Sequence, residues 1–381
     1  MIAAHRPEQR PPDARLLVVD PLGRITHAPR SQLVDFLRPG DLVIANDAAT
    51  LPASLHGVHV RSGAGIEVRL AARSSLEPRD IHAFMAVVFG AGDYHTKTED
   101  RPPPPRLAPG DRLVFGSAAG DVDGRRVAGN GGRPLGAAIE TLLDHPRLVR
   151  LRFGGSADAV WNGLARHGRP IQYAYVSDAL ALWDVWTPIA GLPAAFEPPS
   201  AGFALDWRSI RLMRERAIGF ATMTLAAGIS STGDPDLDRR LPFDEPYRIP
   251  ATTAAAISRA RAEGRRIVAV GTTVVRGLEH AAALDGVVRP GAGVADQRIG
   301  PGRRLRIVDA LLSGTHEPGG SHYQMLRAFL DDCTLADADA ALDARGYRTH
   351  EFGDSVLIER MARAGTAAVV PQREDGMAPA A

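Results

Sequence analysis

The chain of 381 residues has one lysine and one cysteine, and each shortage excludes a kind of chemistry. Lys97 stands beside a proline-rich stretch, so Schiff-base chemistry through lysine is not expected. Because Cys333 has no partner, an intrachain disulfide and a metal site of clustered cysteines are excluded. No apolar run approaches the roughly 20 residues that span a bilayer. Residues 1–12 carry Arg, Glu and Pro where a signal peptide is apolar, so we expect a cytoplasmic protein.

The composition is that of an ordinary globular protein. Hydrophobic residues make up 45% of the chain and charged residues 23%. The formal net charge of +1 gives no global polycationic character, but it does not exclude a local basic stripe on the surface. The length is sufficient for two domains. We expect a monomer without a membrane segment.

Two regions with a similar pattern of apolar residues flank a region with a different pattern. In residues 1–56 and 173–365 short apolar runs alternate with helical segments, which predicts an α/β domain with a parallel-type sheet covered on both faces. Residues 57–172 hold short or alternating runs between Gly-, Pro- and Asp-rich breaks, a pattern typical of an antiparallel β domain. Residues 366–381 are expected to form a flexible tail.

Apolar runs bounded by turn residues predict strands, and longer segments predict helices. The expected strands are 16–20, 42–45, 84–89, 112–115, 148–153, 219–225, 267–270 and 305–308, with further strand pattern in 58–70. The expected helices are 33–37, 156–167, 209–216, 251–263, a helix that follows residue 271 and ends near 283, and 323–330.

The segment 267–279 carries the strongest chemical signal. Four apolar residues predict a buried parallel strand that ends at Gly271, and a helix carrying Arg276 follows Thr272 and Thr273. Free N–H groups at the helix start, two hydroxyls and an arginine could hold a carboxylate, a phosphate or a ribose edge. The alternative is a capped helix after a core strand, with Thr272 or Thr273 as the N-cap.

The pattern Gly-Thr-Thr-x-x-Arg-x-Leu-Glu in this segment resembles a signature of the S-adenosylmethionine:tRNA ribosyltransferase-isomerases, a family of queuosine biosynthesis. Further segments resemble the same family, in the same order, over most of the chain, so the chain is identified as a divergent member. These segments are Ala4-His5-Arg6-Pro7, Leu37-Arg38-Pro39-Gly40-Asp41-Leu42, Asn46-Asp47, Pro199-Ser200-Ala201-Gly202, Val308-Asp309-Ala310-Leu311, His316-x-Pro318 and Phe352-Gly353-Asp354.

The resemblance implies both a fold and a reaction. The fold is a main α/β domain interrupted by an inserted antiparallel β-barrel-like domain. The reaction transfers and isomerises the ribosyl part of S-adenosylmethionine onto 7-aminomethyl-7-deazaguanine in tRNA, which forms epoxyqueuosine and releases methionine and adenine. S-adenosylmethionine is a substrate, and the resemblance implies no metal or redox cofactor. The reaction needs a base for a C5′ proton, an acid for adenine and a positive surface for tRNA.

Three residues are candidates for the catalytic groups. His316 lies in a loop and could shuttle protons, although a surface or capping role explains it equally well. Asp309 follows a strand-like run and could hold ribose hydroxyls or pair with Arg276; a buried helix-capping carboxylate is the alternative. Glu245 is the one residue of segment 241–246 that matches the family's His-Ser-Glu-Tyr segment.

The candidates for substrate binding follow the retained motifs. Asn46 and Asp47 lie at a strand end, where ligand sites of α/β proteins gather, although a turn also explains them. Asp354 matches the family's closing motif, or is a turn aspartate. No metal site is expected, because His316 and His322 are poorly spaced for one helix face and lack nearby carboxylates. The expected binding residues are Gly271, Thr272, Thr273, Arg276, Asn46, Asp47, Ser200, Gly202 and Asp354.

Four aromatic residues lie at the start of the second α/β region. Trp183 and Trp186, with Tyr173 and Tyr175, could stack on bases of a nucleic acid. The alternative is that these rings pack the junction between the two domains.

The chain departs from the family pattern at several polar positions. Ala49 and Ser54 replace arginines, and Ala204, Thr224 and Phe243 replace histidines. The loss of these arginines and histidines threatens anion binding and proton transfer most. Three hypotheses therefore remain: the family reaction with tRNA, a divergent paralogue with another acceptor or no tRNA, and a non-catalytic nucleoside-binding protein.

Overall fold

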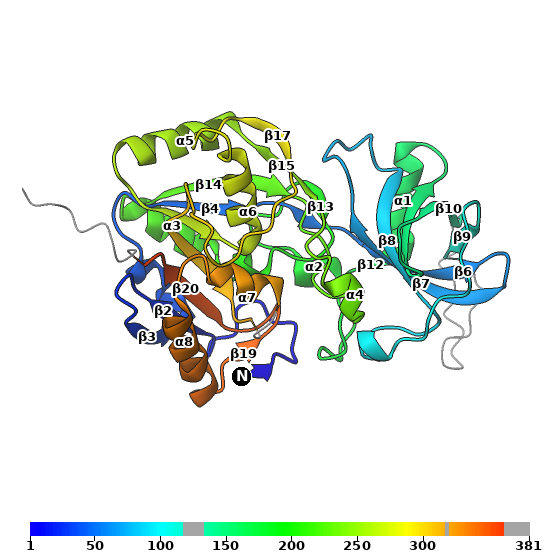
Figure 1. Cartoon of the computed structure of the whole chain (residues 1–381), viewed down its shortest axis with the longest axis horizontal. Coiled ribbons are helices and arrows are strands. Elements are labelled where there is room, and N and C mark those ends of the chain that lie inside the picture. The colour runs from blue at the N-terminus through cyan, green and yellow to red at the C-terminus, as the bar shows by residue number, and fades with distance from the viewer. Residues whose placement is uncertain (117–132, 317–319, 362–381) are drawn as a thin grey trace, which may run out of the picture.

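Two sheets organise the chain and lie in separate lobes of the molecule (Figure 1). The computed structural model describes residues 1–116, 133–316 and 320–361. The tail expected at 366–381, and Pro318 of the histidine–proline motif, lie outside the described residues. Among the described residues, no helix is long and apolar enough to cross a membrane.

The larger sheet has nine strands in the part of the chain that the structure describes. In sheet order they are β17 (Gly291–Ala295), β15 (Glu245–Ile249), β14 (Gly219–Leu225), β4 (Leu42–Asn46), β16 (Ile267–Val270), β18 (Ala310–Gly314), β20 (Ser355–Glu359), β2 (Arg15–Val19) and β3 (Ile25–Pro29). The four strands β14, β4, β16 and β18 form a parallel centre, and β2 is parallel to β20. The remaining pairs are antiparallel.

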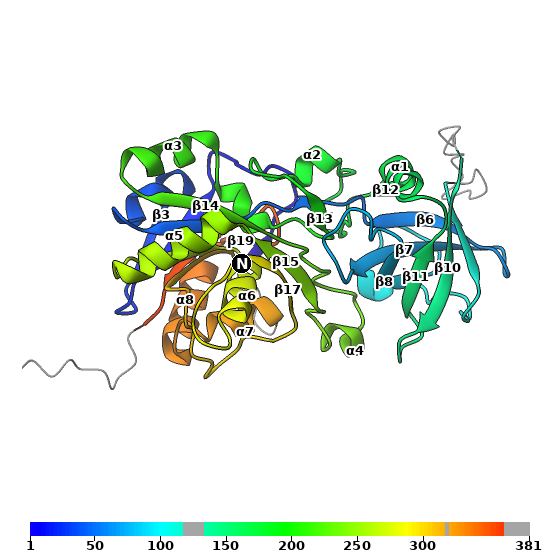
Figure 2. The same ribbon diagram turned by 90° about the horizontal axis from the view of Figure 1, so that it is seen from above.

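Helices cover both faces of this sheet (Figure 2). On one face lie η1 (Arg30–Phe36), η3 (Ser200–Ala204) and α3 (Trp207–Glu215); on the other lie α5 (Ala251–Ala262), α6 (Thr272–Ala281), α7 (Ser321–Leu326) and α8 (Asp332–Ala344). Because strand side chains alternate between faces, Val43 and Val268 belong to the first core while Ile44 and Ala269 belong to the second. This two-sided burial explains the fully apolar central strands.

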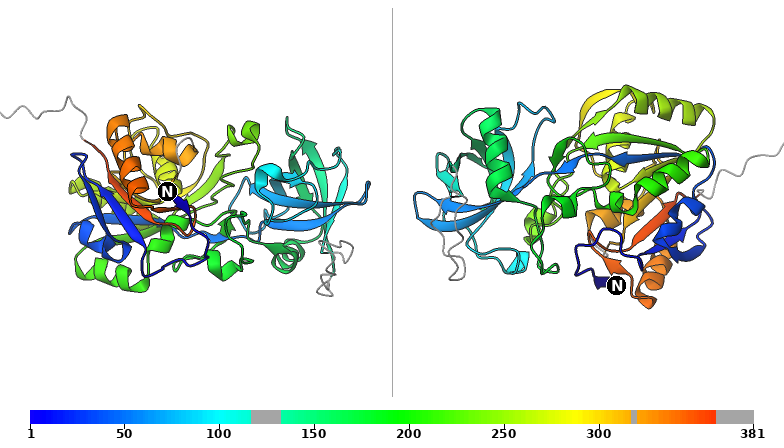
Figure 3. Two further views of the ribbon diagram at one scale, coloured as in Figure 1. Left: turned by 90° about the horizontal axis from the view of Figure 1, so that it is seen from below. Right: turned by 180° about the vertical axis from the view of Figure 1, so that it is seen from behind.

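The smaller sheet closes into an antiparallel barrel (Figure 3). Its six barrel strands are β6 (Ser54–His59), β7 (Ala64–Ala72), β8 (Ala83–Phe89), β9 (Arg112–Phe115), β10 (Leu135–Leu142) and β11 (Leu148–Phe153), and β6 pairs with both β7 and β9. Closure requires Gly57 in β6, because a Cβ there would lie 2.3 Å from the carbonyl oxygen of Val114. The α/β class with an inserted antiparallel barrel is therefore confirmed.

Short elements join and flank the two sheets. They are β1 (Ile2–Ala3), β5 (Ala49–Thr50), η2 (Thr98–Asp100), α1 (Ala157–His167), β12 (Gly168–Arg169), α2 (Leu182–Val185), β13 (Pro193–Ala195), α4 (Pro235–Asp238) and β19 (Arg348–Thr349). The antiparallel sheet runs from Ser54 to Arg169, while the division into domains at residues 57 and 172 stays a prediction.

One expected strand is wrong. Residues 305–308 form no strand, and β18 begins only at Ala310. The backbone N–H groups of Ile307 and Val308 donate to the Glu279 carboxylate instead of a neighbouring strand, at 2.8 and 3.0 Å. The helix α8 and the strands β10 and β20 were not predicted as elements.

The aromatic residues of the junction divide into two groups. The rings of Tyr173 and Tyr175 stack with centroids 5.9 Å apart and line a small hollow together with Glu197 and Glu351. Trp183 is 75% exposed, so the packing alternative is wrong for this residue. Trp186 is partly exposed, and its indole N–H donates to the Thr50 carbonyl at 2.9 Å.

The stacked tyrosines bind two carboxylates. The Tyr173 hydroxyl donates to Glu197, and the Tyr175 hydroxyl donates to Glu351. The Ser230 backbone N–H also donates to Glu197, at 3.1 Å. Burial, and then the nearby Glu351 charge, raise the pKa of the Glu197 carboxyl to about 7.

Replacing Glu197 with glutamine should change how stability depends on pH. The folded protein binds this proton more tightly than the unfolded chain, whose carboxyl keeps its ordinary pKa of 4.5. The free energy of unfolding should therefore fall as pH rises from about 4.5 to about 7. The Glu197→Gln variant should lack this component and exceed the wild type above pH 7 by up to about 3 kcal/mol.

Urea denaturation between pH 4.5 and 8 measures this difference. Glu215→Gln is the matched control, because Glu215 is exposed on α3 and its ion pair in the described part of the chain is with the exposed Arg211. The free energy of unfolding of this control should depend on pH as that of the wild type does. If the free energy of unfolding of Glu197→Gln also followed the pH dependence of the wild type, protonation of Glu197 would not contribute to stability.

Candidate functional site

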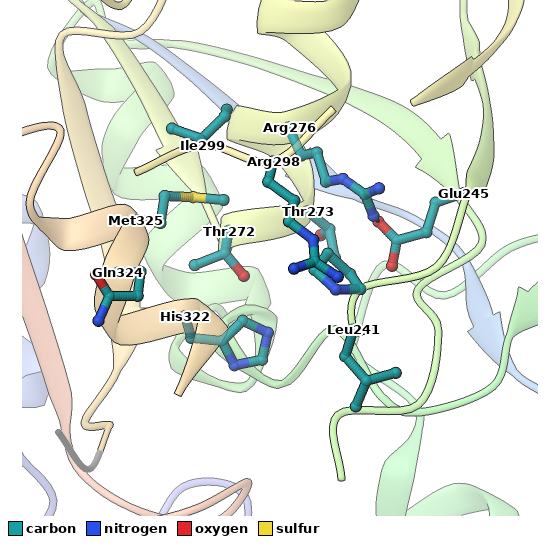
Figure 4. Close-up of a pocket in the computed structure, with 11 residues that line it drawn as sticks. Leu241, Glu245, Thr272, Thr273, Arg276, Arg298, Ile299, His322, Gln324 and Met325 are labelled. Atoms are coloured by element: carbon teal, nitrogen blue, oxygen red, sulfur yellow. Dashed lines mark hydrogen bonds and ion pairs between the residues drawn. The ribbon is translucent and has the colours of Figure 1, made fainter. Parts of the chain in front are cut away.

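A cavity of about 140 Å³ opens where β16 ends and α6 begins (Figure 4). This is the carboxyl edge of the parallel strands, where open α/β sheets bind ligands. The lining residues are Leu241, Pro242, Glu245, Thr272, Thr273, Arg276, Arg298, Ile299, His322, Gln324 and Met325. Four of the residues predicted from the sequence are therefore brought together here: Glu245, Thr272, Thr273 and Arg276.

The start of α6 forms one wall of the cavity. Gly271 is the N-cap, and its φ of +96° is a conformation that few other residues adopt. Its N–H donates to the Leu312 carbonyl at 2.8 Å, which fixes the end of β16 against β18. The expectation of a threonine N-cap is wrong, because Thr272 and Thr273 are the first helical residues. First-turn N–H groups have no acceptor within a helix, so this wall favours an anionic or hydroxyl-bearing group.

Arg276 lies behind this wall and is 2% exposed. Its guanidinium donates to the carbonyls of Phe243, Ala295 and Gln297 at 2.8 to 2.9 Å and to Glu245 at 2.7 Å. These bonds use four of its five N–H donors. Arg276 thus holds two chain segments in place around the cavity.

Glu245 is the buried acid of the site. One carboxylate oxygen accepts from Arg276 and the other accepts from the Gly228 N–H at 2.8 Å. Burial raises the pKa of Glu245, and Arg276 opposes this shift. The sequence could not reveal the pair, because its members lie 31 residues apart in different elements.

Two histidines meet at the opposite wall. His322 lines the cavity, and its ring centroid lies 4.7 Å from that of His316. His316 itself does not line the cavity; its Nε2 is 2.8 Å from the Ser313 hydroxyl. Burial lowers the pKa of His322, and burial, His322 and His350 together lower the pKa of His316 well below its usual value. Both rings are therefore neutral at pH 7.

Asn46 and Asp47 fix the ends of the neighbouring strands. The Asn46 side chain donates to the Leu225 carbonyl at 2.9 Å and accepts from the Leu225 N–H at 3.0 Å, which ties β4 to β14. The same amide lies 3.5 Å from the Thr273 hydroxyl. Asp47 accepts a 2.6 Å hydrogen bond from Thr224, one of the positions that depart from the family pattern. Neither Asn46 nor Asp47 lines the cavity.

Ser200 and Gly202 lie in η3, on the sheet face opposite α6. A Cβ at Gly202 would approach the Thr187 side chain to 2.9 Å, so the glycine permits close packing of η3. Ala201 between them lies beneath Gly271, with its Cβ 3.6 Å from the position of an added Cβ. Their expected contact with substrate stays a prediction, since they support the loop rather than line the cavity.

Asp309 lies at the opposite edge of the sheet, where β16 and β18 begin. Its carboxylate accepts from the Ile267 N–H at 3.0 Å and from Arg360 at 2.8 Å. The expected pairing of Asp309 with Arg276 is therefore wrong, because each has another partner. The whole length of the four-residue strand β16 therefore lies between Asp309 and the cavity.

Asp354 is 1% exposed and also lies outside the cavity lining. It accepts from the backbone N–H groups of Arg15 and Arg348, both at 2.8 Å, and from both guanidinium groups. This arrangement ties the start of β2 to the segment that precedes β20.

Several cavity residues were not predicted from the sequence. Arg298 is exposed at the mouth and forms no hydrogen bond or ion pair with the residues that the structure describes. Gln324 and Met325 come from α7, and Ile299 follows Arg298 in the loop. None belongs to a motif, so only the folded chain reveals them. Within the described residues, no group of three or more His, Cys, Asp or Glu could hold a metal ion.

The sequence is similar to known proteins over most of its length. The sequence model of a family described as queuosine biosynthesis protein matches residues 1–358. An S-adenosylmethionine:tRNA ribosyltransferase-isomerase of Synechococcus elongatus is 32% identical over 353 residues, which cover 91% of this chain and 89% of the relative. Its counterpart from Methylobacterium sp. is 32% identical over 368 residues, covering 94% and 95%.

A third relative of the same name, from Sorangium cellulosum, is 33% identical over 374 residues and covers 94% of this chain and 95% of its own. A crystal structure of an S-adenosylmethionine tRNA ribosyltransferase from Thermotoga maritima matches with a TM-score of 0.47 and 24% identity, over 93% and 95% of the two chains. The family match covers nearly the whole described chain. The protein therefore belongs to the queuosine biosynthesis protein family.

Proposed function

We propose that this protein transfers and isomerises the ribosyl moiety of S-adenosylmethionine onto 7-aminomethyl-7-deazaguanine in tRNA, which forms epoxyqueuosine. The observation that carries the proposal is the cavity at the start of α6, built by the segment that resembles the family signature. Relatives named for this reaction match more than nine-tenths of the chain. S-adenosylmethionine is the substrate, no further cofactor takes part, and a cytoplasmic monomer acts on tRNA.

The cavity supports recognition of an anionic end of the donor. The start of α6, the two threonine hydroxyls and Arg298 surround the same space (Figure 4). Such a set favours a carboxylate, and S-adenosylmethionine carries one on its methionine part. The cavity of about 140 Å³ is smaller than a typical small-molecule site of about 300 Å³ or more, so it holds only part of the donor.

The histidine pair supports the proton transfer. Because burial keeps His322 neutral, its ring can accept a proton from a substrate atom in the cavity. His316 packs against this ring and contacts Ser313, so it helps to position His322. Glu245 is already ion-paired, which favours a role in charge balance over a role as the free base.

The direct test is release of adenine and methionine from S-adenosylmethionine in the presence of tRNA that carries the precursor base. Chromatography with mass spectrometry measures both products and the modified nucleoside. Wild-type protein should release both in equal amounts, and only with this tRNA. An absence of adenine above background would refute the function.

Replacing Arg298 with glutamine should raise the KM for S-adenosylmethionine about 10- to 100-fold, because a charge-assisted hydrogen bond to the carboxylate is lost. The change in kcat should be smaller, since the carboxylate is bound in the ground state and the transition state alike. Arg208→Gln on α3 is the control, because Arg208 is exposed on the other face of the sheet. An unchanged KM in Arg298→Gln would contradict the carboxylate site.

A divergent paralogue on the same scaffold is the second candidate. The positions that lack the family's arginines and histidines are filled by contacts of this chain's own, such as the 2.8 Å hydrogen bond from Ser54 to the buried Glu67. Binding of S-adenosylmethionine without affinity for precursor tRNA, measured at a stated salt concentration, would favour this candidate.

A further inference from the structure

A groove lined by arginines lies near the end of α6 that is remote from the cavity. We call it the arginine groove. Two neighbouring hollows share Arg303, Arg304 and Arg306, and the larger encloses about 1160 Å³. The arginines that line it are Arg261 of α5, Arg303, Arg304 and Arg306 of the loop before β18, Arg327 after α7 and Arg360 after β20.

Four of these six arginines lack a carboxylate partner within residues 1–116, 133–316 and 320–361. Arg327 pairs with Asp332, and Arg360 pairs with Asp309. The other four arginines of the groove have no carboxylate partner among the described residues. Two acids line the two hollows: Asp331 caps α8 by accepting from the Thr334 N–H at 2.8 Å, and Glu279 accepts from backbone N–H groups. The groove therefore presents several unpaired guanidinium groups in one concave surface.

The loop that carries these arginines is anchored by its backbone. Both oxygens of the buried Glu279 carboxylate accept from the loop, one from the Arg306 N–H at 2.8 Å and one from the next two N–H groups. The Arg261 side chain donates to the Arg306 carbonyl at 2.6 Å, and Arg360 donates to the Leu305 carbonyl at 2.8 Å. A positive surface that is preformed in this way loses little conformational entropy when it binds an anion.

One helix connects the groove to the cavity. Thr272 and Thr273 at the start of α6 line the cavity, whereas Glu279 near its end and Ala283 just beyond it line the groove. A helix of ten residues is about 15 Å long. One strand of double-stranded DNA carries a phosphate about every 3.4 Å along its axis, so a span of this length corresponds to a few nucleotides of a stacked strand.

We propose that the arginine groove binds the phosphate backbone of the RNA substrate, next to the nucleotide whose base is modified in the cavity at the start of α6. The inference rests on the proposed function, because it takes the acceptor base to belong to an RNA chain. Guanidinium groups bind phosphates in a bidentate manner, and Arg303 and Arg304 form no ion pair with the residues that the structure describes.

The test is the double variant Arg303→Gln/Arg304→Gln in the full chain. Both side chains are exposed and form no hydrogen bond or ion pair with the residues that the structure describes, so the melting temperature should stay unchanged. The dissociation constant for precursor tRNA should rise at least about tenfold, and the slope of its logarithm against log salt should fall by about two. The KM for S-adenosylmethionine at saturating tRNA should not change.

The control is Arg208→Gln/Arg214→Gln. These arginines are exposed on α3, on the opposite face of the sheet, and their replacement removes the same charge. The control should bind tRNA as the wild type does. Equal losses in both double variants would show that total charge acts rather than the groove, and would overturn the inference.

The binding measurement also separates the two proposals. If the wild type releases adenine with precursor tRNA but the groove variant keeps the wild-type affinity and salt slope, the groove inference is wrong and the function stands. If no adenine is released, the function is wrong, while loss of tRNA affinity confined to the groove variant still supports the groove.

Discussion

Replacing Arg276 with methionine should destabilise the protein by about 3–5 kcal/mol, because it leaves the Glu245 carboxylate buried without its counter-charge. The carbonyls of Phe243, Ala295 and Gln297 also lose their donor. Urea denaturation at pH 7 measures the loss. The loss should be smaller at low pH, because a protonated Glu245 carries no charge, and burial already raises the pKa of this group.

The double variant Arg276→Met/Glu245→Gln is the matched control. Removing both charges relieves the unpaired carboxylate, so part of the lost stability should return even though the carbonyls stay without a donor. A double variant no more stable than Arg276→Met would mean that the carbonyl contacts, rather than the ion pair, account for the loss. A loss below about 1 kcal/mol in the single variant would contradict the structural role of Arg276 altogether.

Replacing Asp354 with alanine should cost a similar amount, about 3–5 kcal/mol. The substitution leaves two backbone N–H groups and parts of two guanidinium groups without an acceptor, in a region where Asp354 is fully enclosed. It also releases the start of β2 from Arg348, far away in the sequence. Thermal and urea unfolding measure the change.

Asp13→Ala is the control for this site, because Asp13 contacts the same Arg348 from an exposed position. Its loss should stay below about 1 kcal/mol. Asp354→Asn decides whether the residue also binds substrate. Since Asp354 does not line the cavity, the folded fraction of this variant should keep the wild-type KM for S-adenosylmethionine. A raised KM would restore the predicted role in binding.

The local pattern of the chain predicted the elements around the site well. The strand at 267–270 and the helix after Gly271 follow from an apolar run, a glycine and helix-forming residues, and these are signals within a few neighbouring positions. The same holds for β14 and for β9 and β11 in the barrel. The strand expected at 305–308 failed because a distant carboxylate, Glu279, captures its N–H groups.

The site itself was only half predictable, because its contacts join residues that are far apart in the sequence. Thr272, Thr273, Arg276 and Glu245 were expected and do meet. No sequence pattern shows that Arg276 has Glu245 as its partner or that Asp309 lies at the other end of the strand. Arg298 carries no motif, and its place at the mouth of the cavity depends on how the loop folds.

The rigid connection through α6 has a consequence for substrate size. Arg276 and Glu279 lie about one helical turn apart, and each binds a different loop, so the helix keeps the distance between the cavity and the arginine groove fixed. If the arginine groove binds RNA phosphates as proposed, an acceptor must span this fixed distance to contact both sites. We therefore expect an oligonucleotide to be a better acceptor than a mononucleoside, which reaches only the cavity.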